Sequence, residues 1–369
     1  MTPIRHVLKI ALLAMFFPVS ASSATLAQWN DHAMSLIVTF EGSAYNAVTL
    51  DADCQGLSLG KKQHTVRANS IKEVFEEAIA KVGRDAFDRI IEQALGDKAS
   101  EFQRLVEYSQ AGSSRLKERM ELVRSWQEIR AGSQWVALTE GPCANGASRE
   151  NGVELRLKTP YAQRLARFLE HPTIVAAQDV LIAKKGEMAL QRATCWALAV
   201  RGAKAPSFQE YLFFFDYLVQ NGDSFTMRNQ LQAIAQTIAF GPDTVAAKDD
   251  GFALQKMIQL REWLQAGFKN MGGGKPGHAQ YAQQNAVEWM VRFEAGKISR
   301  DKIRLAYVGL MRAMLGNNQW GYTAMNRRST IAFGGGTVNK DTYSEETMQA
   351  FFQEAGEIDA SALAAITCI

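Results

Sequence analysis

The sequence predicts a mainly helical protein with a small amount of β structure (α+β). Apolar residues recur at spacings of three and four along most of its 369 residues. Strand-like runs are short and few, and the glycines and prolines mark brief connections instead of a long linker. We therefore expect residues 25–369 to form one large helical unit, built as two lobes, and not two independent domains.

Each predicted helix rests on this spacing. In Ser70–Val82 the apolar positions include Ile71 and Phe75, which are four residues apart on one face, and Ser70 with Glu73 has the pattern of a capping box. A first helix begins at Asn30 or Asp31 and ends at Glu41. Further helices are predicted over Ala86–Ala94, Phe102–Tyr108, Leu116–Ile129, Pro160–Leu169, Ile174–Lys184, Phe208–Gln220, Met227–Phe240, Leu254–Gln265, Asn285–Glu294 and Ile303–Leu315.

Strand predictions are limited to three short runs. Val48–Leu50 and Gly56–Leu59 flank a polar turn, so we expect them to form a hairpin. Ser329–Phe333 is the third candidate strand.

The N-terminus has the organisation of an export signal. In Met1–Ala24, two basic residues precede the apolar run Ile10–Phe17, and small residues follow it. The run is too short to cross a hydrocarbon core of ~30 Å, so no membrane span is expected after cleavage. We expect cleavage after Ala24, with Ala21 as the alternative, and a periplasmic or secreted protein.

Removal of this signal changes the charge balance. The whole chain has 41 basic and 38 acidic residues, and residues 1–24 contain two of the bases and none of the acids. The remaining chain is therefore close to neutral and has no basic stripe, which argues against nucleic acid as a partner.

Four cysteines, Cys54, Cys143, Cys195 and Cys368, are available for disulfides in an oxidising compartment. The chain contains neither CxxC nor HExxH, so we expect no zinc site and no other cofactor. Sequence leaves all three pairings open, as well as buried thiols. We favour Cys54–Cys143 with Cys195–Cys368.

The stretch after the first helix carries the most chemical information. Glu41 lies four residues after Ile37, so it shares the apolar face of the helix. Desolvation and the dipole of the helix C-terminus both favour a protonated carboxyl group, which is the form that a general acid needs. We expect Asp51 and Asp53, in the turn of the hairpin, to be solvated and ionised, so that one of them serves as the second carboxylate.

The motif Phe40-Glu41-Gly42, followed by Tyr45, by Asp53-Cys-Gln-Gly-Leu-Ser-Leu-Gly60 and by Gln63, resembles the active-site segment of the lysozyme-like superfamily. Peptidoglycan-hydrolase relatives of phage-type lysozymes and bacterial chitosanases are the nearest match. The resemblance implies a two-lobed fold with a small β-hairpin at the active-site cleft. Cys54 departs from the pattern, because it replaces the usual glycine.

Roles for the matched residues also follow from the resemblance. It implies that Glu41 is the general acid, that Asp53 is the second carboxylate and that Ser58 orients the water. It implies that Tyr45 and Gln63 face the substrate, and Asp51 is a further carboxylate that could compete for the role of base.

Two later segments resemble the same relatives. These are the helix end Phe215-Asp-Tyr-Leu-Val-Gln-Asn-Gly222 and the basic stretch Arg327–Val338, which is expected to be a strand. Four of their polar residues are candidates for lining the cleft, with helix capping and ion pairing as the alternative; they are Asp216, Gln220, Asn221 and Arg327. His32 and His64 flank the main motif, and surface or capping roles are expected for both.

Together these features predict an exported glycoside hydrolase that cleaves β-1,4-linked amino-sugar polymers by acid/base chemistry with two carboxylates. The resemblance implies inversion at the anomeric carbon, and the sequence leaves retention open. Peptidoglycan is the expected substrate, because export places the protein beside it. A chitosanase and a non-catalytic peptidoglycan-binding protein on a lysozyme-like scaffold are the alternatives. The sequence gives no indication of the oligomeric state.

Overall fold

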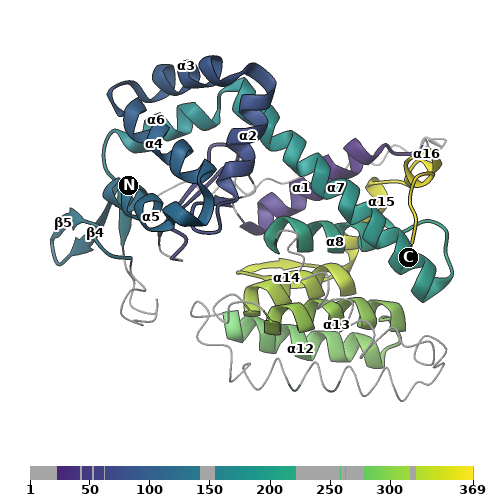
Figure 1. The fold of residues 1–369 in the computed structure, drawn as a ribbon. Coiled ribbons are helices and arrows are strands. Elements are labelled where there is room, and N and C mark those ends of the chain that lie inside the picture. Colours follow the sequence, from purple (N-terminus) through teal and green to yellow (C-terminus); the bar gives the residue numbers. More distant parts are fainter. Residues whose placement is uncertain are drawn as a thin grey trace, which may run out of the picture.

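Within its described residues, the computed structural model is mainly helical and contains three small antiparallel sheets, which confirms the predicted class (Figure 1). The described residues are 23–41, 44–51, 54–61, 63–141, 154–221, 258, 262, 278–315 and 321–368. The helices are α1 (Leu26–Glu41), α2 (Ile71–Val82), α3 (Arg84–Leu95), α4 (Ala99–Gln110), α5 (Leu116–Ser125), α6 (Tyr161–Leu169), α7 (Pro172–Arg201), α8 (Phe208–Asn221), α12 (His278–Glu294), α13 (Arg300–Leu315), α14 (Gly321–Phe333), α15 (Glu345–Glu354) and α16 (Ala360–Leu363).

The sheets are local in sequence. Their strands are β1 (Val48–Leu50), β2 (Leu57–Leu59), β3 (His64–Thr65), β4 (Gln127–Ala131), β5 (Gln134–Ala137), β6 (Leu155–Leu157), β7 (Gly336–Val338) and β8 (Asp341–Tyr343). The strand orders are β1-β2-β3, β5-β4-β6 and β7-β8. The predicted hairpin of β1 and β2 is confirmed, with Thr49 opposite Ser58.

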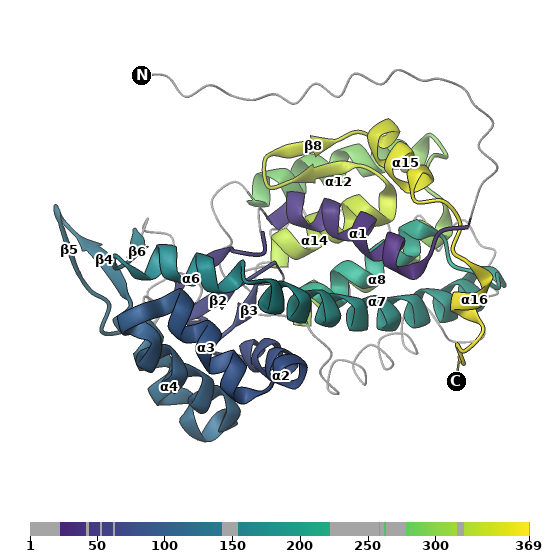
Figure 2. The ribbon, with the colours of Figure 1, turned by 90° about the horizontal axis from the view of Figure 1, so that it is seen from above.

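Helix α7 is the longest described helix, with 30 residues, and it contacts both halves of the molecule. Figure 2 shows it running across the structure, with α2 and α6 beside one half and α1 and α8 beside the other. Pro172 lies in its first turn, where the missing N–H is not needed, and Gly202 ends it in the left-handed conformation with φ of 67°.

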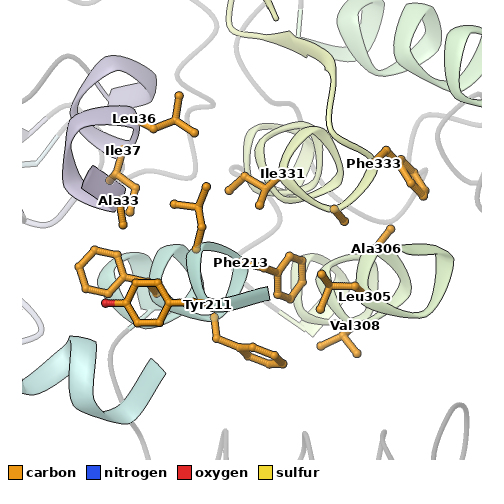
Figure 3. Close-up of a cluster of buried hydrophobic side chains, with 14 of the residues drawn as sticks. Ala33, Leu36, Ile37, Tyr211, Phe213, Leu305, Ala306, Val308, Ile331 and Phe333 are labelled. Atoms are coloured by element: carbon orange, nitrogen blue, oxygen red, sulfur yellow. The ribbon is translucent and has the colours of Figure 1, made fainter. Parts of the chain in front are cut away.

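Two clusters of buried apolar side chains lie along α7. The smaller cluster is built from β2 and α2 to α6, and Ile174 and Leu181 of α7 join it. The larger cluster is built from α1, α8 and α12 to α15, and Leu190 and Trp196 of α7 join it. Figure 3 shows side chains of α1, α8, α13 and α14 meeting in the larger cluster.

The packing of α1 against α7 requires a glycine. A Cβ atom on Gly186 would lie 1.9 Å from Oδ1 of Asn30 in α1. A side chain at this position would therefore clash with Asn30. The buried hydroxyl of Tyr211 in α8 donates to the same Asn30 oxygen. The three helices are therefore fixed to one another through a polar contact inside an apolar cluster.

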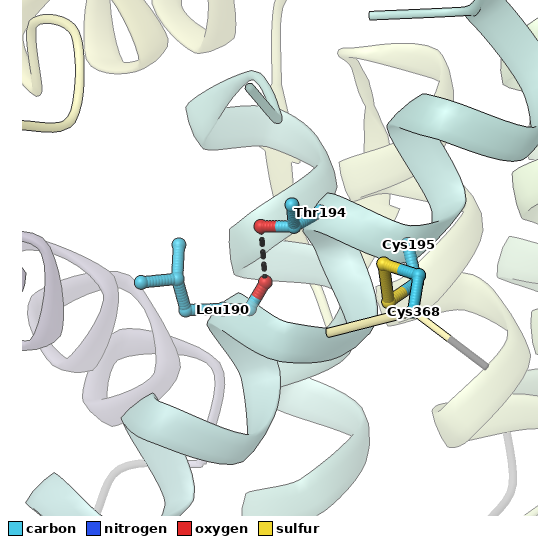
Figure 4. Close-up of a disulfide and its surroundings, with 4 residues drawn as sticks. All are labelled: Leu190, Thr194, Cys195 and Cys368. Carbon is cyan, nitrogen blue, oxygen red and sulfur yellow. Dashed lines mark hydrogen bonds between the residues drawn. A yellow bond between two sulfur atoms is a disulfide. The ribbon is translucent and has the colours of Figure 1, made fainter. Parts of the chain in front are cut away.

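The C-terminal segment returns to α1 and α7. Trp29 of α1 donates from Nε1 to the carbonyl of Ala355 over 3.1 Å. The disulfide Cys195–Cys368 fastens the end of the described chain to α7, as predicted (Figure 4). Cys54 is also disulfide-bonded; Cys143, the partner predicted for it, lies outside the described residues.

Several predicted elements need correction. The helix predicted over Leu116–Ile129 ends at Ser125, because Gln127 begins strand β4 and pairs with Leu157. The helix predicted over Ile174–Lys184 continues to Arg201.

The strand predicted over Ser329–Phe333 is wrong. These residues end helix α14, and the strand β7 follows three residues later. The β-branched residues favour a strand locally, but α14 packs closely on α13, where Gly309 allows the approach of Arg328. Tertiary packing therefore overrides the local preference.

The capping box predicted at Ser70 and Glu73 does not form. The Ser70 hydroxyl accepts instead from the backbone N–H of Thr65 over 2.8 Å, and it makes no capping bond to α2. Of the remaining predictions, Met227–Phe240 lies outside the described residues, as does Leu254–Gln265 except for the helical residues Ile258 and Glu262.

Candidate functional site

Glu41 is the last residue of α1, as predicted, and its side chain lies outside the described part of the chain. The preceding residue, Phe40, is buried and packs edge-on against Tyr343 of β8, with ring centres 5.1 Å apart. The carbonyl of Phe40 accepts a hydrogen bond of 2.7 Å from Nδ2 of Asn339. This carbonyl is one of the last four of the helix, which have no partner within the helix itself.

Asn339 lies in the turn between β7 and β8 with φ of 58°, a conformation that Asn adopts more readily than most residues. The turn therefore presents a side-chain donor to the end of α1. The hairpin of β7 and β8, which is distant from α1 in sequence, therefore helps to fix the backbone of α1 next to Glu41.

Ser58 lies at the centre of the three-stranded sheet, opposite Thr49 on β1 and Thr65 on β3. Its neighbours Leu57 and Leu59 both enter the smaller cluster. Side chains alternate along a strand, so Ser58 points to the face away from that cluster. It is nevertheless buried, with 2% of its surface exposed.

Asp53 lies outside the described residues. The residues on either side of the turn, Asp51 and Cys54, are described. They show how the turn is anchored.

The expectation that Asp51 is solvated is wrong, because its side chain is fully buried. Its Oδ2 accepts from Nε of Arg124 over 2.7 Å, and its Oδ1 accepts from the backbone N–H of Gly56 over 2.5 Å. Its own N–H donates to Oε1 of Gln127, and Nε2 of Gln127 donates to the carbonyl of Gly56. Asp51 is thus an anchor of the turn, and its burial removes it from contact with a polymer.

Tyr45 lies where the sheet meets α7. Its hydroxyl donates to Asp179, and Nζ of Lys61 lies 3.2 Å from the same hydroxyl and 4.4 Å from the ring centre. Burial, followed by the hydrogen bond and the charge of Asp179, raises the pKa of Tyr45 above its usual range. Tyr45 therefore stays protonated at neutral pH and acts as a donor.

Gln63, the other predicted substrate contact near the hairpin, is half-buried and has φ of 53°. Its backbone N–H donates to the carbonyl of Gly60, which closes the turn after β2. Gly60 is required there, since a Cβ atom would lie 2.3 Å from Oε1 of Gln178.

Asp216 and Arg327 are brought together, but in the interior of the molecule. Both are buried, and Nε of Arg327 lies 2.7 Å from Oδ1 of Asp216. Nε of Arg328 lies 3.6 Å from the other carboxylate oxygen. The ion-pairing alternative is therefore confirmed, and a cleft-lining role for this pair is wrong. Gln220 and Asn221 end α8, and their side chains lie outside the described residues.

The two histidines beside the motif have structural partners. Nε2 of His32 lies 2.7 Å from the carbonyl of Phe351, and its ring stacks on that side chain. His64 is buried, with Nδ1 3.1 Å from the carbonyl of Ser70.

Sequence reasoning missed the residues that hold these groups in place, namely Arg124, Gln127, Gln178, Asp179 and Asn339. Of these, only Asn339 has a local signal. It stands between two short strands, where a turn residue with positive φ is expected.

Among the described residues, no group of three His, Cys, Asp or Glu side chains lies close enough to hold a metal ion. No helix in the same part of the chain is long and apolar enough to cross a membrane. Comparison with protein-family models, with curated proteins and with solved structures found no match to this chain.

Proposed function

We propose that the protein is an exported glycoside hydrolase that cleaves peptidoglycan, with Glu41 as the general acid and Asp53 as the base that activates water. One observation carries the proposal. Glu41 ends a helix that has one buried face, and a three-stranded antiparallel sheet follows directly, with Asp53 between β1 and β2 in sequence and Ser58 on the central strand. This is the order of elements that the lysozyme-like resemblance implies.

The placement of the two clusters supports the same proposal. Helix α1 belongs to the larger cluster, whereas β2 belongs to the smaller one. An acid at the end of α1 and a base in the turn beside β2 would then act from the two lobes of the protein, on opposite sides of one glycan strand. Acid/base cleavage needs such an arrangement, because the leaving oxygen and the attacking water lie on opposite faces of the sugar.

The strand position of Ser58 supports its proposed role as the residue that orients the water. It lies on the sheet face away from the smaller cluster, between the hydroxyl-bearing residues Thr49 and Thr65. The proposed roles are that Asp53 removes a proton from the water and that Ser58 holds this water by a hydrogen bond. Tyr45 and Gln63 would contact the sugar on the side of α7.

The test is digestion of purified peptidoglycan by the mature protein, measured as released muropeptides. We expect Glu41→Gln to lower kcat by about 10²–10⁴-fold, the usual contribution of a positioned acid. Glu354→Gln is the matched control, because Glu354 is an exposed residue that also ends a helix, α15. An inactive wild type, or equal activity of Glu41→Gln and wild type, would refute the proposal.

The same preparation decides between the alternatives. Release of reducing ends from chitosan but not from peptidoglycan would indicate a chitosanase. Co-sedimentation with sacculi without any product would indicate a wall-binding protein on a lysozyme-like scaffold.

A further inference from the structure

The residues just before α1 take part in the fold. The N–H of Ala24 donates to the carbonyl of Glu357 over 2.7 Å, and the N–H of Asp359 donates to the carbonyl of Ala24 over 2.9 Å. These two bonds form a parallel bridge between Ala24 and Ile358. The side chain of Ala24 packs against the larger cluster, and the Ser23 hydroxyl lies 3.4 Å from a carboxylate oxygen of Asp359. Figure 2 shows the C-terminal segment passing the start of α1.

The N–H of Thr25 also takes part in the start of α1. The N–H of Thr25 donates to Oε1 of Gln28 over 2.8 Å, and the N–H of Gln28 donates to the Thr25 hydroxyl over 3.3 Å. This reciprocal pair is a capping box that satisfies two N–H groups at the helix start. It joins the bridge at Ala24 to the first turn of the helix.

Cleavage after Ala24 would remove the bridge and place a positive charge at the start of α1. Ala24 would leave with the signal, so the carbonyl of Glu357 and the N–H of Asp359 would lose their partners. The nitrogen of Thr25 would become an ammonium group at the positive end of the α1 dipole, where a cation is unfavourable.

The sequence also permits the earlier cut, which is the alternative named in the sequence analysis. Both cuts would follow an alanine; Val19 and Ser20 precede Ala21, whereas Ser22 and Ser23 precede Ala24. A cut after Ala21 preserves the bridge, the Ser23 contact and the capping box. Residues 22–24 carry no charge, so the near-neutral balance of the mature chain is the same for either cut.

We propose that the export signal is removed after Ala21, so that the mature protein begins at Ser22 and retains Ser23 and Ala24, which contact the C-terminal segment. The proposal rests on the export function proposed above, but not on the glycosidase activity. Its readout is the N-terminus of the exported protein, which is measured whether or not peptidoglycan is cleaved.

The experiment is expression of the full chain in a bacterium, followed by intact-mass analysis and N-terminal sequencing of the exported protein after denaturation. We expect Ser22 as the first residue. An N-terminus at Thr25, at any other residue, or at Met1 with the signal retained would overturn the proposal.

Two matched variants locate the cut without depending on folding. Ala21→Leu places a large residue at the proposed site and should abolish cleavage there, with accumulation of the precursor. Ala24→Leu should still yield a mature chain that begins at Ser22. The reverse pattern would show that the protease uses Ala24.

A second measurement tests the physical reason. Two leader-free chains, released from a cleavable tag with first residues Ser22 and Thr25, are compared by thermal unfolding. The chain that begins at Thr25 lacks two backbone hydrogen bonds and carries a charge at the helix start, so its Tm should be lower by about 2–5 °C. Equal Tm values would show that Ser23 and Ala24 do not stabilise the folded protein, and would overturn the physical reason for the earlier cut.

Discussion

Two buried carboxylates, Asp51 and Asp216, are paired with arginine in two different regions of the molecule. Asp51 pairs with Arg124 beside the smaller cluster, and Asp216 pairs with Arg327 inside the larger one. Asp51 also accepts from the backbone of Gly56 within its own turn, whereas Asp216 faces two arginines on another helix. The first pair thus sets the shape of a turn, and the second sets the packing of two helices.

The different surroundings of the two ion pairs indicate how each pair relates to function. The Asp51 turn contains Asp53, so its geometry is part of the proposed active site. The pair of Asp216 and Arg327 joins α8 to α14 through fully enclosed side chains. A polar residue within a segment that resembles the lysozyme-like superfamily is therefore not always a substrate contact. Its burial shows whether it can reach a substrate or only stabilises the fold.

The largest effect is expected from Asp216→Ala. Removal of this carboxylate leaves Arg327 and Arg328 without their shared anion in the interior, so the free energy of unfolding should fall by about 3–5 kcal/mol. Urea denaturation followed by circular dichroism measures the change. Glu187→Ala, which removes an exposed acid on α7, is the control and should lower stability much less. A loss for Asp216→Ala below about 1 kcal/mol would contradict the buried pair.

A comparison of Asp51→Asn with Asp53→Asn separates the anchor from the proposed base. Asp51→Asn weakens two hydrogen bonds to a buried, charged acceptor and should lower the free energy of unfolding by about 1.5–3 kcal/mol. Asp53→Asn should leave Tm nearly unchanged and abolish muropeptide release. Thermal unfolding and the digestion assay on both variants give the result. If Asp53→Asn lost stability and Asp51→Asn lost only activity, the two roles would be exchanged.

A smaller effect is expected from Asn339→Gly, which keeps the positive φ but removes the donor to the carbonyl of Phe40. The loss in stability should be about 1 kcal/mol. Because the end of α1 becomes less well fixed, kcat on peptidoglycan should fall several-fold while KM stays constant, and the pH optimum should shift.

The control for this variant is Lys340→Ala, the exposed neighbour in the same turn. It should leave kcat, KM and the pH profile unchanged. Asn339→Gly with wild-type kinetics and a lower Tm would show that the contact is structural only.

The sequence predicts those features that depend on near neighbours. The end of α1 at Glu41 and the hairpin of β1 and β2 follow from helical spacing and a polar turn, and both are confirmed. The burial of Asp51 depends on Arg124 and Gln127, which lie more than 70 positions away and enter from another helix and strand. No local pattern could reveal them.

Long-range packing also explains the wrong prediction for α14. Its last residues carry β-branched side chains, but their polar groups and the neighbouring Arg328 are enclosed by α8 and α13. A helix is stabilised there by its neighbours, not by its composition. For Asp216 and Arg327, the sequence allows either a cleft-lining position or an ion pair. Only the fold, which buries both side chains together, distinguishes these two possibilities.

The smallest predicted effect concerns an acid that is held without arginine. Glu101 of α4 is partly buried, which by itself raises the pKa of its carboxyl group. Hydrogen bonds from Tyr161, Lys98 and Trp126 outweigh that effect, so the pKa of Glu101 in the folded state is lowered. Its stabilising contribution is therefore present above the pKa of the unfolded chain and is lost as the pH falls through the folded value.

The variant Glu101→Gln tests this predicted pH dependence of stability. At about pH 7 it should lower the free energy of unfolding by up to about 1 kcal/mol, and at about pH 3 the difference from wild type should shrink, because the wild-type carboxyl group is then largely protonated. Urea denaturation at both pH values measures the two differences, with Glu107→Gln on the exposed face of the same helix as the control. A larger destabilisation at low pH than at neutral pH would contradict the lowered pKa. The hydroxyl, ammonium and indole donors would then not favour the charged form of Glu101.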